Sequence, residues 1–380
     1  MKILFLDQSG KPGGAELCLI DIAKLYRDSC LVGLFADGSF RNLLEQQQIP
    51  VQVLTTQSIQ VRKKSSLVQG LASLGQLLPL ITKVAQIASE YDLIYANTQK
   101  ALVVGALASF FSRCPLVYHL HDILSSEHFS STNRRLAVTF ANRFASLVIV
   151  NSKATKAAFI EAGGRSESTE VVYNGFEPEK YIIQKSRSNQ IRQQLGLNGQ
   201  FVVGHFSRLS PWKGQHILLE ALVHCPDDVT AILVGDALFG EQDYVEHLHQ
   251  QVVKLGLKER VQFLGFRSDI VSLMSACNLI AHTSTAPEPF GRVIVEAMLC
   301  GQPVVAAEAG GAIELVETGK TGWLVPPENP QQLAEIITTC RKQPDYAATI
   351  AQESQIQASQ RFHLATINQQ IAQLLGHVCK

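Results

Sequence analysis

The sequence lacks an excess of either charge, a closely spaced cysteine pair and an uninterrupted apolar segment of membrane-spanning length. Lys and Arg total 33 and Asp and Glu total 33, which gives a formal net charge of zero. Without an overall positive field the chain is not expected to bind nucleic acid, and any site for an anionic ligand must be local.

The eight cysteines are scattered, mostly inside apolar stretches, with no C-x-x-C pair and no spacing typical of a zinc site. This pattern is typical of buried free thiols in a reducing compartment. We therefore expect a cytoplasmic protein that carries neither a metal ion nor another cofactor.

Two apolar stretches resemble membrane or export signals only in part. The leucine-rich stretch from Leu67 to Ala88 is interrupted by two glycines, Pro79 and Lys83, so it is not a continuous bilayer-spanning segment. The N-terminal apolar run ends at Asp7, and no small-residue cleavage site follows it. The sequence therefore predicts neither a transmembrane helix nor a signal peptide.

The chain has 380 residues and 46% hydrophobic content, which are enough for two sizeable cores. Short β-branched runs alternate with longer helical patterns, which indicates βαβ units and parallel sheets buried on both faces. We predict an α/β protein with two Rossmann-like, doubly wound parallel sheets. The predicted strands are Ile3 to Leu6, Leu31 to Phe35, Val51 to Leu54, Leu93 to Tyr95, Leu116 to Tyr118, Leu147 to Val150, Val171 to Tyr173, Phe201 to Val203, Ala231 to Val234, Val261 to Leu264, Leu279 to Ala281, Val304 to Ala306 and Trp323 to Val325.

A polar and charged segment from Phe176 to Gln200 separates the two sets of strands. We place the domain boundary at its start, which gives an N-terminal domain of residues 1–175 and a C-terminal domain of residues 176–359. The segment from Tyr346 to His377 is predicted to be helical with Gln-rich polar faces. This organisation is typical of an enzyme with two domains and a cleft.

The segment from His282 to Met298 has the strongest functional pattern. A strand ends before it, a Pro-rich turn follows, and a helix is predicted to begin near Phe290 or Gly291, so backbone N–H groups face the carboxyl edge of a sheet. Glu288 precedes this helix and Glu296 lies about two turns into it. The alternative is that Glu288 caps the helix and Glu296 is solvated.

A second segment, Gly204 to Gln215, also follows a strand. Arg208 and Lys213 are predicted to project from a loop at the sheet edge, and Ser210 is predicted to start a helix. Arg can contact two phosphate oxygens and Lys supplies a mobile charge, so the pair suits a diphosphate. The alternative is two surface cations.

Three further segments carry weaker signals. Gly13 and Gly14 lie in a loop after the first strand, and their backbone can approach a ligand closely. His121 follows His119 at a strand end, where both side chains share a face if the strand continues that far. A glycine pair at residues 310 and 311 leads into a predicted helix and suits either a ligand or a tight turn.

Together these segments resemble the retaining glycosyltransferases of family 4, which have the GT-B fold, two Rossmann-like domains facing across a cleft. Ser207 to Gly214 resembles the family's G-R-L-x-x-x-K-G segment, with Ser207 in place of its usual glycine. Glu288 to Glu296 matches its E-x7-E signature. The resemblance covers nearly the whole chain, and its remaining segments are Met1 to Glu16, Asn151 to Lys156, Tyr173 to Gly175 and Val261 to Phe266.

The resemblance implies roles for residues of the second domain. Arg208 and Lys213 would hold the donor diphosphate, Glu288 would contact sugar hydroxyls, and Glu296 would hydrogen-bond the ribose. Phe290, Gly291 and Arg292 would present the turn and its amides to the sugar and phosphate, and Phe266 and Arg267 would meet the base.

The resemblance also implies roles for the first domain. Gly13 and Gly14 would belong to the loop that meets the donor, with Gly14 against the diphosphate, and His121 would contact the donor sugar. The helix of residues 360–380 would pack back on this domain.

The implied activity is metal-independent transfer of a sugar from a nucleotide-diphospho-sugar to an acceptor hydroxyl, in cell-surface polysaccharide or glycolipid synthesis. Two alternatives stay open. A nucleotide-sugar 2-epimerase of the same fold would turn over the donor without an acceptor, and a catalytically inactive sugar-nucleotide-binding protein would be stabilised by the donor without transfer. An NAD-dependent oxidoreductase is disfavoured because the first glycine-rich loop lacks G-x-G-x-x-G spacing.

The resemblance implies a saccharide or a lipid-linked saccharide as the acceptor. Arg62, Lys63 and Lys64 precede the leucine-rich stretch. We hypothesise a peripheral contact between this basic run and the anionic inner face of a membrane, with a solvated loop as the alternative.

Overall fold

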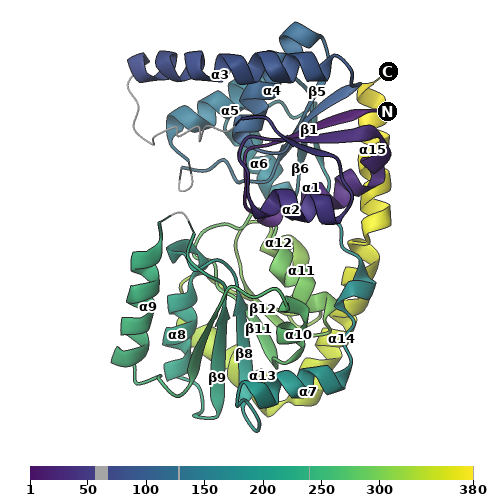
Figure 1. The fold of residues 1–380 in the computed structure, drawn as a ribbon. Coiled ribbons are helices and arrows are strands. Elements are labelled where there is room, and N and C mark those ends of the chain that lie inside the picture. Colours follow the sequence, from purple (N-terminus) through teal and green to yellow (C-terminus); the bar gives the residue numbers. More distant parts are fainter. Residues whose placement is uncertain (56–66, 127–128, 239, 380) are drawn as a thin grey trace. The chain divides into compact units, whose positions relative to one another are not determined.

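The computed structural model describes residues 1–55, 67–126, 129–238 and 240–379 of the chain (Figure 1). The contacts divide it into two compact units. Unit 1 contains Met1–Gly175 and Leu364–Lys380, and unit 2 contains Phe176–His363. Each unit has its own parallel sheet with helices on both faces, so the predicted fold class is confirmed.

Unit 1 has a seven-stranded sheet in the order β3-β2-β1-β4-β5-β6-β7. Alternate side chains of β1 enter different cores: Leu4 and Leu6 pack with α3, α4 and α5, whereas Ile3 and Phe5 pack with α1, α2 and α15. The strands are β1 (Ile3–Asp7), β2 (Cys30–Leu34), β3 (Val51–Val53), β4 (Leu93–Ala96), β5 (Leu116–Leu120), β6 (Ala145–Val150) and β7 (Thr169–Val171). The helices are α1 (Gly14–Ala23), η1 (Lys24–Ser29), α2 (Ser39–Gln46), α3 (Leu67–Ala88), α4 (Gln99–Ser112), α5 (Ser131–Phe144), α6 (Lys153–Glu161) and α15 (Leu364–Val378).

Unit 2 has a six-stranded sheet in the order β10-β9-β8-β11-β12-β13. The strands are β8 (Phe201–Phe206), β9 (Val229–Val234), β10 (Val261–Gly265), β11 (Leu279–His282), β12 (Val304–Ala307) and β13 (Trp323–Val325). The helices are η2 (Pro178–Tyr181), α7 (Lys185–Gln194), η3 (Pro211–Lys213), α8 (Gln215–Val223), α9 (Gln242–Lys254), α10 (Ile270–Ser275), α11 (Arg292–Leu299), α12 (Ala312–Leu315), α13 (Pro330–Lys342) and α14 (Pro344–Arg361).

In both units the strand order reverses beside the first strand. The reversal lies between β1 and β4 in unit 1 and between β8 and β11 in unit 2. Loops that leave the carboxyl ends of such neighbouring strands diverge to opposite faces of the sheet, and ligands of open α/β sheets bind in the crevice between them. The topology therefore selects the loops after β1, β4, β8 and β11 as places for a site.

Every predicted strand overlaps a strand of the structure, and the segment from Tyr346 to His377 is mostly helical as predicted, but the helix start predicted at Ser210 is wrong. The segment from Tyr346 to His377 is not one helix, because α14 ends at Arg361 and α15 begins at Leu364. Buried Phe362 lies at this break. Ser210 precedes only the short 3-10 turn η3, and α8 begins at Gln215 after a left-handed Gly214.

The leucine-rich stretch forms α3, a 22-residue helix that contains Pro79. Among the described residues, none of the helices combines the length and the apolar character needed to cross a bilayer. The basic run at residues 62–64 lies outside the described residues.

Candidate functional site

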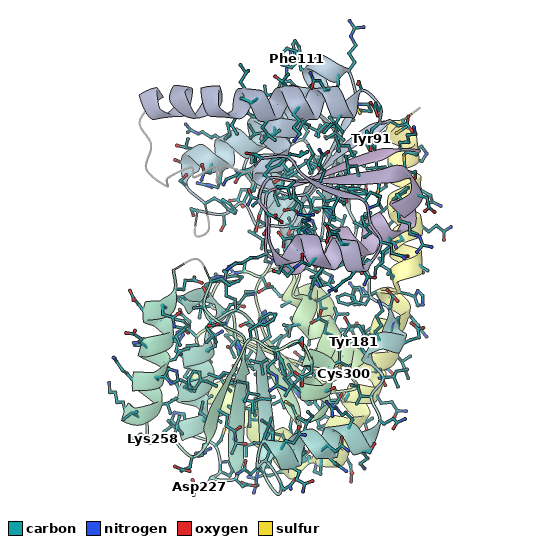
Figure 2. The ribbon with its side chains drawn as sticks, viewed as in Figure 1. Tyr91, Phe111, Tyr181, Asp227, Lys258 and Cys300 are labelled. Carbon is teal, nitrogen blue, oxygen red and sulfur yellow. The ribbon has the colours of Figure 1, made fainter. Side chains whose placement is uncertain are left out.

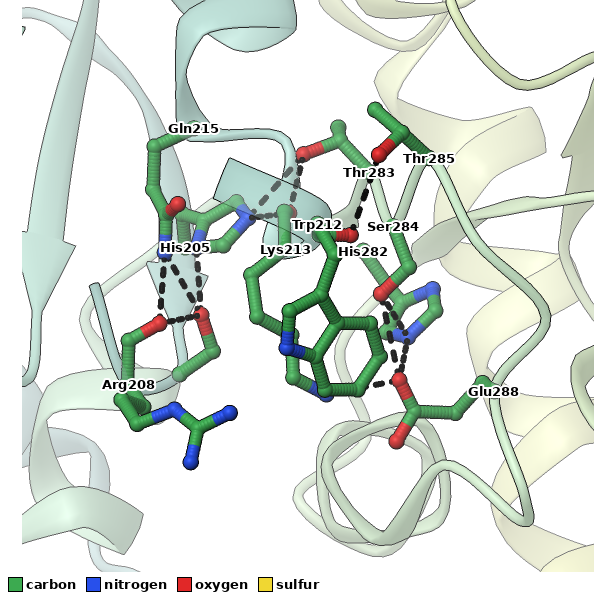
Figure 3. A network of polar contacts seen from close by, with 11 residues as sticks. His205, Arg208, Trp212, Lys213, Gln215, His282, Thr283, Ser284, Thr285 and Glu288 are labelled. Carbon is green, nitrogen blue, oxygen red and sulfur yellow. Dashed lines mark hydrogen bonds and ion pairs between the residues drawn. The ribbon is translucent and has the colours of Figure 1, made fainter. Parts of the chain in front are cut away.

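The loops after β8 and β11 bring Lys213 and Glu288 together at the reversal point of unit 2 (Figure 3). The Lys213 Nζ donates to Glu288 Oε2 at 2.6 Å, and both side chains are mostly buried. The same ammonium lies 3.9 Å from the centroid of the Trp212 ring. The sequence predicted both residues as site residues, and the structure pairs them across 75 positions of the chain.

Glu288 is held as an ionised carboxylate by its neighbours. Its Oε2 also accepts hydrogen bonds from His282 Nε2 at 3.2 Å and Ser284 Oγ at 3.1 Å. Burial acts to raise the Glu288 pKa, but the charge of Lys213 and the hydrogen bond from His282 outweigh it and hold the pKa well below its ordinary value. Glu288 is not the cap of α11, since Gly291 occupies the cap position.

Buried His205 ties the two loops to each other. Its Nε2 donates to the Lys213 carbonyl at 3.2 Å and to Thr283 Oγ1 at 3.0 Å. Thr283 Oγ1 in turn donates to the Gly214 carbonyl at 2.7 Å, and the Thr285 amide donates to the Trp212 carbonyl at 2.8 Å. These bonds fix the backbone on both sides of Lys213, as the dashed lines in Figure 3 show.

Arg208 belongs to the same loop as Lys213. Its Nε forms an ion pair with Glu241 Oε2 at 3.4 Å, and Glu241 also accepts a hydrogen bond from Ser210 Oγ at 2.5 Å. Gln215 Nε2 donates to the Arg208 carbonyl at 2.9 Å and so positions the backbone. In Figure 3 the guanidinium and the Lys213 ammonium extend from the loop in the same direction.

The turn before α11 is built by glycine and aromatic packing. Gly291 has a φ of +96°, a left-handed conformation that favours glycine. Phe290 is buried, with its ring centroid 5.8 Å from that of Phe362. Arg292 lies 4.5 Å from the Phe176 ring centroid and 3.6 Å from Glu296 Oε1. The side chains of Arg292 and Glu296 thus form a pair along the first turns of α11.

The glycine pair at residues 310 and 311 packs against the backbone of Glu288. Gly310 forms a bridge with Glu288, and the Gly311 amide donates to the Glu288 carbonyl at 2.6 Å. A Cβ on Gly310, whose φ is +62°, would overlap the Glu288 backbone. The two glycines therefore allow the backbone at residues 310 and 311 to lie close to the Glu288 backbone and to support the loop that carries Glu288.

Phe266 and Arg267 follow β10, which β9 separates from β8. Phe266 is 78% exposed, so its ring face is open to a ligand. Arg267 forms a two-pronged hydrogen bond with Asp269, at 2.8 and 2.6 Å. These two residues follow the edge strand of the sheet, whereas Lys213 and Glu288 follow its central strands β8 and β11.

Unit 1 has its own polar cluster at the reversal between β1 and β4. Gly13 caps α1, and its amide donates to Glu16 Oε2 at 2.8 Å; Gly14 is the first residue of the helix. Burial, and then the charge of Asp7, raise the pKa of Glu16 to about 7. Burial also raises the pKa of Asp7 to about 6, although a hydrogen bond from Asn97 acts against the rise.

His119 and His121 lie on one face at the end of β5, with ring centroids 3.9 Å apart. Burial, and then the charge of His121, lower the pKa of His119 well below its ordinary value. His121 is half-buried, and its Nε2 contacts Asn97 Oδ1 at 2.9 Å. The strand ends at Leu120, one residue before His121, so the two rings lie side by side although the strand does not continue as far as the predicted alternation required.

Comparison with known proteins identifies the family. The family model "Glycosyltransferase Family 4" matches residues 12–180, and "Glycosyl transferases group 1" matches residues 187–357. The crystal structure of Anabaena HepE in complex with UDP-glucose is 67% identical and has a TM-score of 0.93, covering 99% of this chain and 100% of that one. The chain belongs to the group 1 glycosyltransferases.

More distant relatives share less sequence identity with this glycosyltransferase. Spore coat protein SA of Bacillus subtilis is 33% identical over 51% of this chain and 55% of its own length, so the match spans about half of that relative. A D-inositol 3-phosphate glycosyltransferase of Corynebacterium efficiens is 27% identical over 75% of this chain and 71% of its own. A sucrose-phosphate synthase of Thermosynechococcus elongatus, 21% identical with a TM-score of 0.83, shares the fold.

Sequence reasoning missed several polar residues of the glycosyltransferase that surround the predicted ones. His205, His282 and Asn97 are buried and contact predicted site residues or their backbone. Each follows or ends an apolar strand run, and this position at the carboxyl end of a strand is the signal that could have found them.

His205 is predicted to make the stability of the enzyme depend on pH. Burial, and then the charge of His282, lower its pKa to about 3 in the folded protein, whereas an unfolded chain has a His pKa of about 6.5. Below pH 6.5 only the unfolded state takes up this proton, so the stability present at pH 7 is lost as the pH falls, by about 2 kcal/mol at pH 5. Urea unfolding of wild type and His205→Asn at both pH values is expected to show that the variant lacks this part of the loss. Exposed His224 is the matched control: if His224→Asn changes the pH dependence as much as His205→Asn, the assignment to His205 is wrong.

Proposed function

We propose that this glycosyltransferase transfers the sugar of a UDP-sugar, with UDP-glucose as the first donor to test, to an acceptor hydroxyl with retention at the anomeric carbon. The carrying observation is the 67% identity, over nearly the full length of both chains, to Anabaena HepE crystallised with UDP-glucose. Structures of that protein with UDP, and with UDP and glucose, are similarly matched.

The Lys213–Glu288 pair supports the donor assignment in unit 2. Lys213 offers a partly desolvated ammonium for the β-phosphate, and Arg208 offers a second cation from the same loop. Glu288 is an ionised carboxylate, so it can only accept hydrogen bonds, which suits the hydroxyls of a sugar. We assign the amides of residues 290–292 to the phosphate and sugar, and Glu296 to the ribose.

The exposed ring of Phe266 supports a site for the nucleotide base at the sheet edge. The open face of Phe266 can stack on a pyrimidine ring, and the Arg267 backbone follows it directly. In unit 1 we assign Gly13 and Gly14 to the approach of the diphosphate, because their amides begin α1. His121 is assigned to a donor-sugar hydroxyl.

The chemistry needs stabilisation of the diphosphate as its bond to the anomeric carbon breaks. Lys213, Arg208 and the amides before α11 supply this stabilisation without a metal ion. The acceptor oxygen approaches the same face of the sugar, and its proton passes to the departing phosphate oxygen. Glu288 then positions the sugar and is not the general base.

A donor panel tests the proposal. With UDP-glucose at a hundred times its Kd, the folded state is expected to gain about 2.7 kcal/mol, whereas GDP- and ADP-sugars produce smaller thermal shifts. Lys213→Ala is expected to reduce the shift, and Lys320→Ala, on the exposed surface of the same unit, is the control that keeps it. If no UDP-sugar stabilises the wild-type protein, the proposal is wrong.

Product analysis separates transfer from the two alternatives. A transferase releases UDP in proportion to glycosylated acceptor, an epimerase converts the donor without an acceptor, and an inactive binder shows the thermal shift without either product. Retention is read from the anomeric configuration of the product by NMR.

We also propose that the acceptor is a saccharide or lipid-linked saccharide used in cell-surface polysaccharide or glycolipid synthesis, and that unit 1 contacts an anionic membrane face. The helices α3 and α4 pack on each other and expose Leu78, Phe110 and Phe111. Figure 2 shows Phe111 on the outer surface of this unit. Exposed apolar side chains, in a part of the chain that also carries the basic run at residues 62–64, are typical of interfacial binding.

Vesicle co-sedimentation tests the membrane contact. Wild type is expected to bind vesicles that contain anionic lipid and to bind neutral vesicles less. Lys63→Glu is expected to weaken the electrostatic contribution to vesicle binding, and the double variant Phe110→Ser with Phe111→Ser is expected to weaken the apolar contribution. Equal binding by all three proteins contradicts the proposed contact.

A further inference from the structure

Cys18, His119 and His121 form a cluster in unit 1 that none of the proposed catalytic steps uses as a whole. Their ligand atoms, one from each residue, all lie within 4.8 Å of one another. Cys18 comes from α1, His119 comes from β5 and His121 lies just after that strand, with the two imidazole ring centroids 3.9 Å apart. A thiol and two imidazoles are the ligand types that zinc prefers.

One nitrogen of each imidazole ring already takes part in a hydrogen bond. His119 Nδ1 contacts the Tyr95 hydroxyl at 2.7 Å, and His121 Nε2 contacts Asn97 Oδ1 at 2.9 Å. Metal-binding histidines are usually fixed by such a bond from the nitrogen that does not bind the metal. The nitrogens that these two bonds do not involve are His119 Nε2 and His121 Nδ1.

The orientation of the Asn97 amide determines the tautomer of His121. Asn97 Nδ2 lies 3.2 Å from the Ala15 carbonyl and 2.7 Å from Asp7 Oδ2. A carbonyl oxygen can only accept, so the amide nitrogen must face it and Oδ1 must face His121. The Nε2 of His121 then carries a hydrogen, and its Nδ1 has the lone pair that a metal requires.

His119 Nε2 supplies an independent observation. Among the side-chain atoms that the structure describes, this nitrogen is buried and has no hydrogen-bond partner. Buried polar atoms without partners are uncommon and call for an explanation such as an ion. A cation bound between His119 Nε2, His121 Nδ1 and Cys18 Sγ would provide the missing partner.

We propose that Cys18, His119 and His121 form a site for a thiophilic divalent cation, with Zn²⁺ as the ion. Binding forms one Zn–S and two Zn–N bonds and releases the Cys18 thiol proton to solvent. Tetrahedral zinc places neighbouring ligand atoms about 3.5 Å apart, so the side chains close by roughly 1 Å. His121 is half-buried, which leaves the fourth position open to water.

The site shares His121 with the proposed donor-sugar contact, and this consequence rests on the proposed function. An ion on His121 Nδ1 and a sugar hydroxyl compete for the same nitrogen. Zinc is therefore expected to inhibit transfer, and removing Cys18 is expected to relieve the inhibition without removing a group that contacts the substrate.

Cobalt absorption tests the site without any activity measurement. The titration uses the Cys379→Ser protein, because Cys379 is exposed and would bind Co²⁺ on its own thiolate. One equivalent of Co²⁺ is expected to give the visible bands of a four-coordinate ion and a near-ultraviolet thiolate charge-transfer band, and one equivalent of Zn²⁺ is expected to abolish both.

Cys18→Ser added to that protein is expected to lose the charge-transfer band and to weaken cobalt binding at least tenfold, whereas Cys114→Ser, a matched buried thiol of the same unit, keeps both. His119→Gln provides a second test if Cys18→Ser unfolds. An unchanged spectrum in folded Cys18→Ser, or no cobalt spectrum in the starting protein, overturns the proposal. A cobalt site found in a protein that binds no UDP-sugar leaves the metal site standing and refutes only the proposed function.

Discussion

Lys213→Ala is expected to lower kcat/KM by about 10²- to 10³-fold, the scale of losing one preorganised charge contact to a transition state. The ammonium lies in a mostly buried position, 2.6 Å from Glu288 Oε2 and 3.9 Å from the Trp212 ring centroid. Low exposure makes its charge act strongly on a departing diphosphate, because little water screens it.

The same substitution is also expected to destabilise unit 2 by about 3 to 5 kcal/mol, because it leaves the Glu288 carboxylate buried without its opposite charge. Glu288→Gln removes that charge. The double variant, Lys213→Ala with Glu288→Gln, is therefore expected to recover most of the lost stability while its activity stays low.

Urea unfolding and steady-state kinetics on the two single variants and the double variant separate these effects. Lys320→Ala, on the exposed surface of unit 2, is expected to match wild type in both measurements. Turnover of folded Lys213→Ala within threefold of wild type would remove Lys213 from the mechanism. Recovery of activity in the double variant would show that Lys213 serves only to neutralise Glu288.

Gly214→Ala is expected to destabilise the protein by about 2 to 5 kcal/mol, combining the cost of a left-handed alanine with that of a steric clash. Gly214 has a φ of +69° and joins η3 to α8. A Cβ there would overlap the carbonyl oxygen of Thr283. The loop that carries Lys213 would then separate from the loop that carries Glu288.

Gly256→Ala is the matched control, because Gly256 has a φ of +71° and open space around its Cβ position. This variant is expected to lose about 1 to 2 kcal/mol of unfolding free energy, from backbone strain alone. The difference between the two free energies of unfolding measures the clash at Thr283. Equal losses in the two variants would mean that the loops adjust, and that their close approach does not hold the site together.

The strands were predictable because each is a local run of apolar residues buried on both faces. Glu288 and Lys213 were predictable as site residues because each follows such a run. Their ion pair was not, since it joins residues 75 positions apart and depends on β8 and β11 being neighbours.

The same limit explains the other differences. The break between α14 and α15 depends on where buried Phe362 packs in unit 2, beside Phe290, and helical periodicity does not encode that contact. Cys18 and His119 are 101 positions apart in the sequence. The spacing of residues in the sequence therefore does not reveal this cluster, which the fold brings together.

The position of α15 has a consequence for biosynthesis. Ile367, Ile371 and Leu375 complete one of the two apolar cores of unit 1, against the sheet face that includes Ile3 and Phe5. The ribosome adds these residues only after all of unit 2 has been translated. Unit 2 can therefore fold while the nascent chain is still growing, whereas unit 1 must wait with the part of this sheet face that α15 covers still exposed, and in this interval a chaperone has apolar surface to protect.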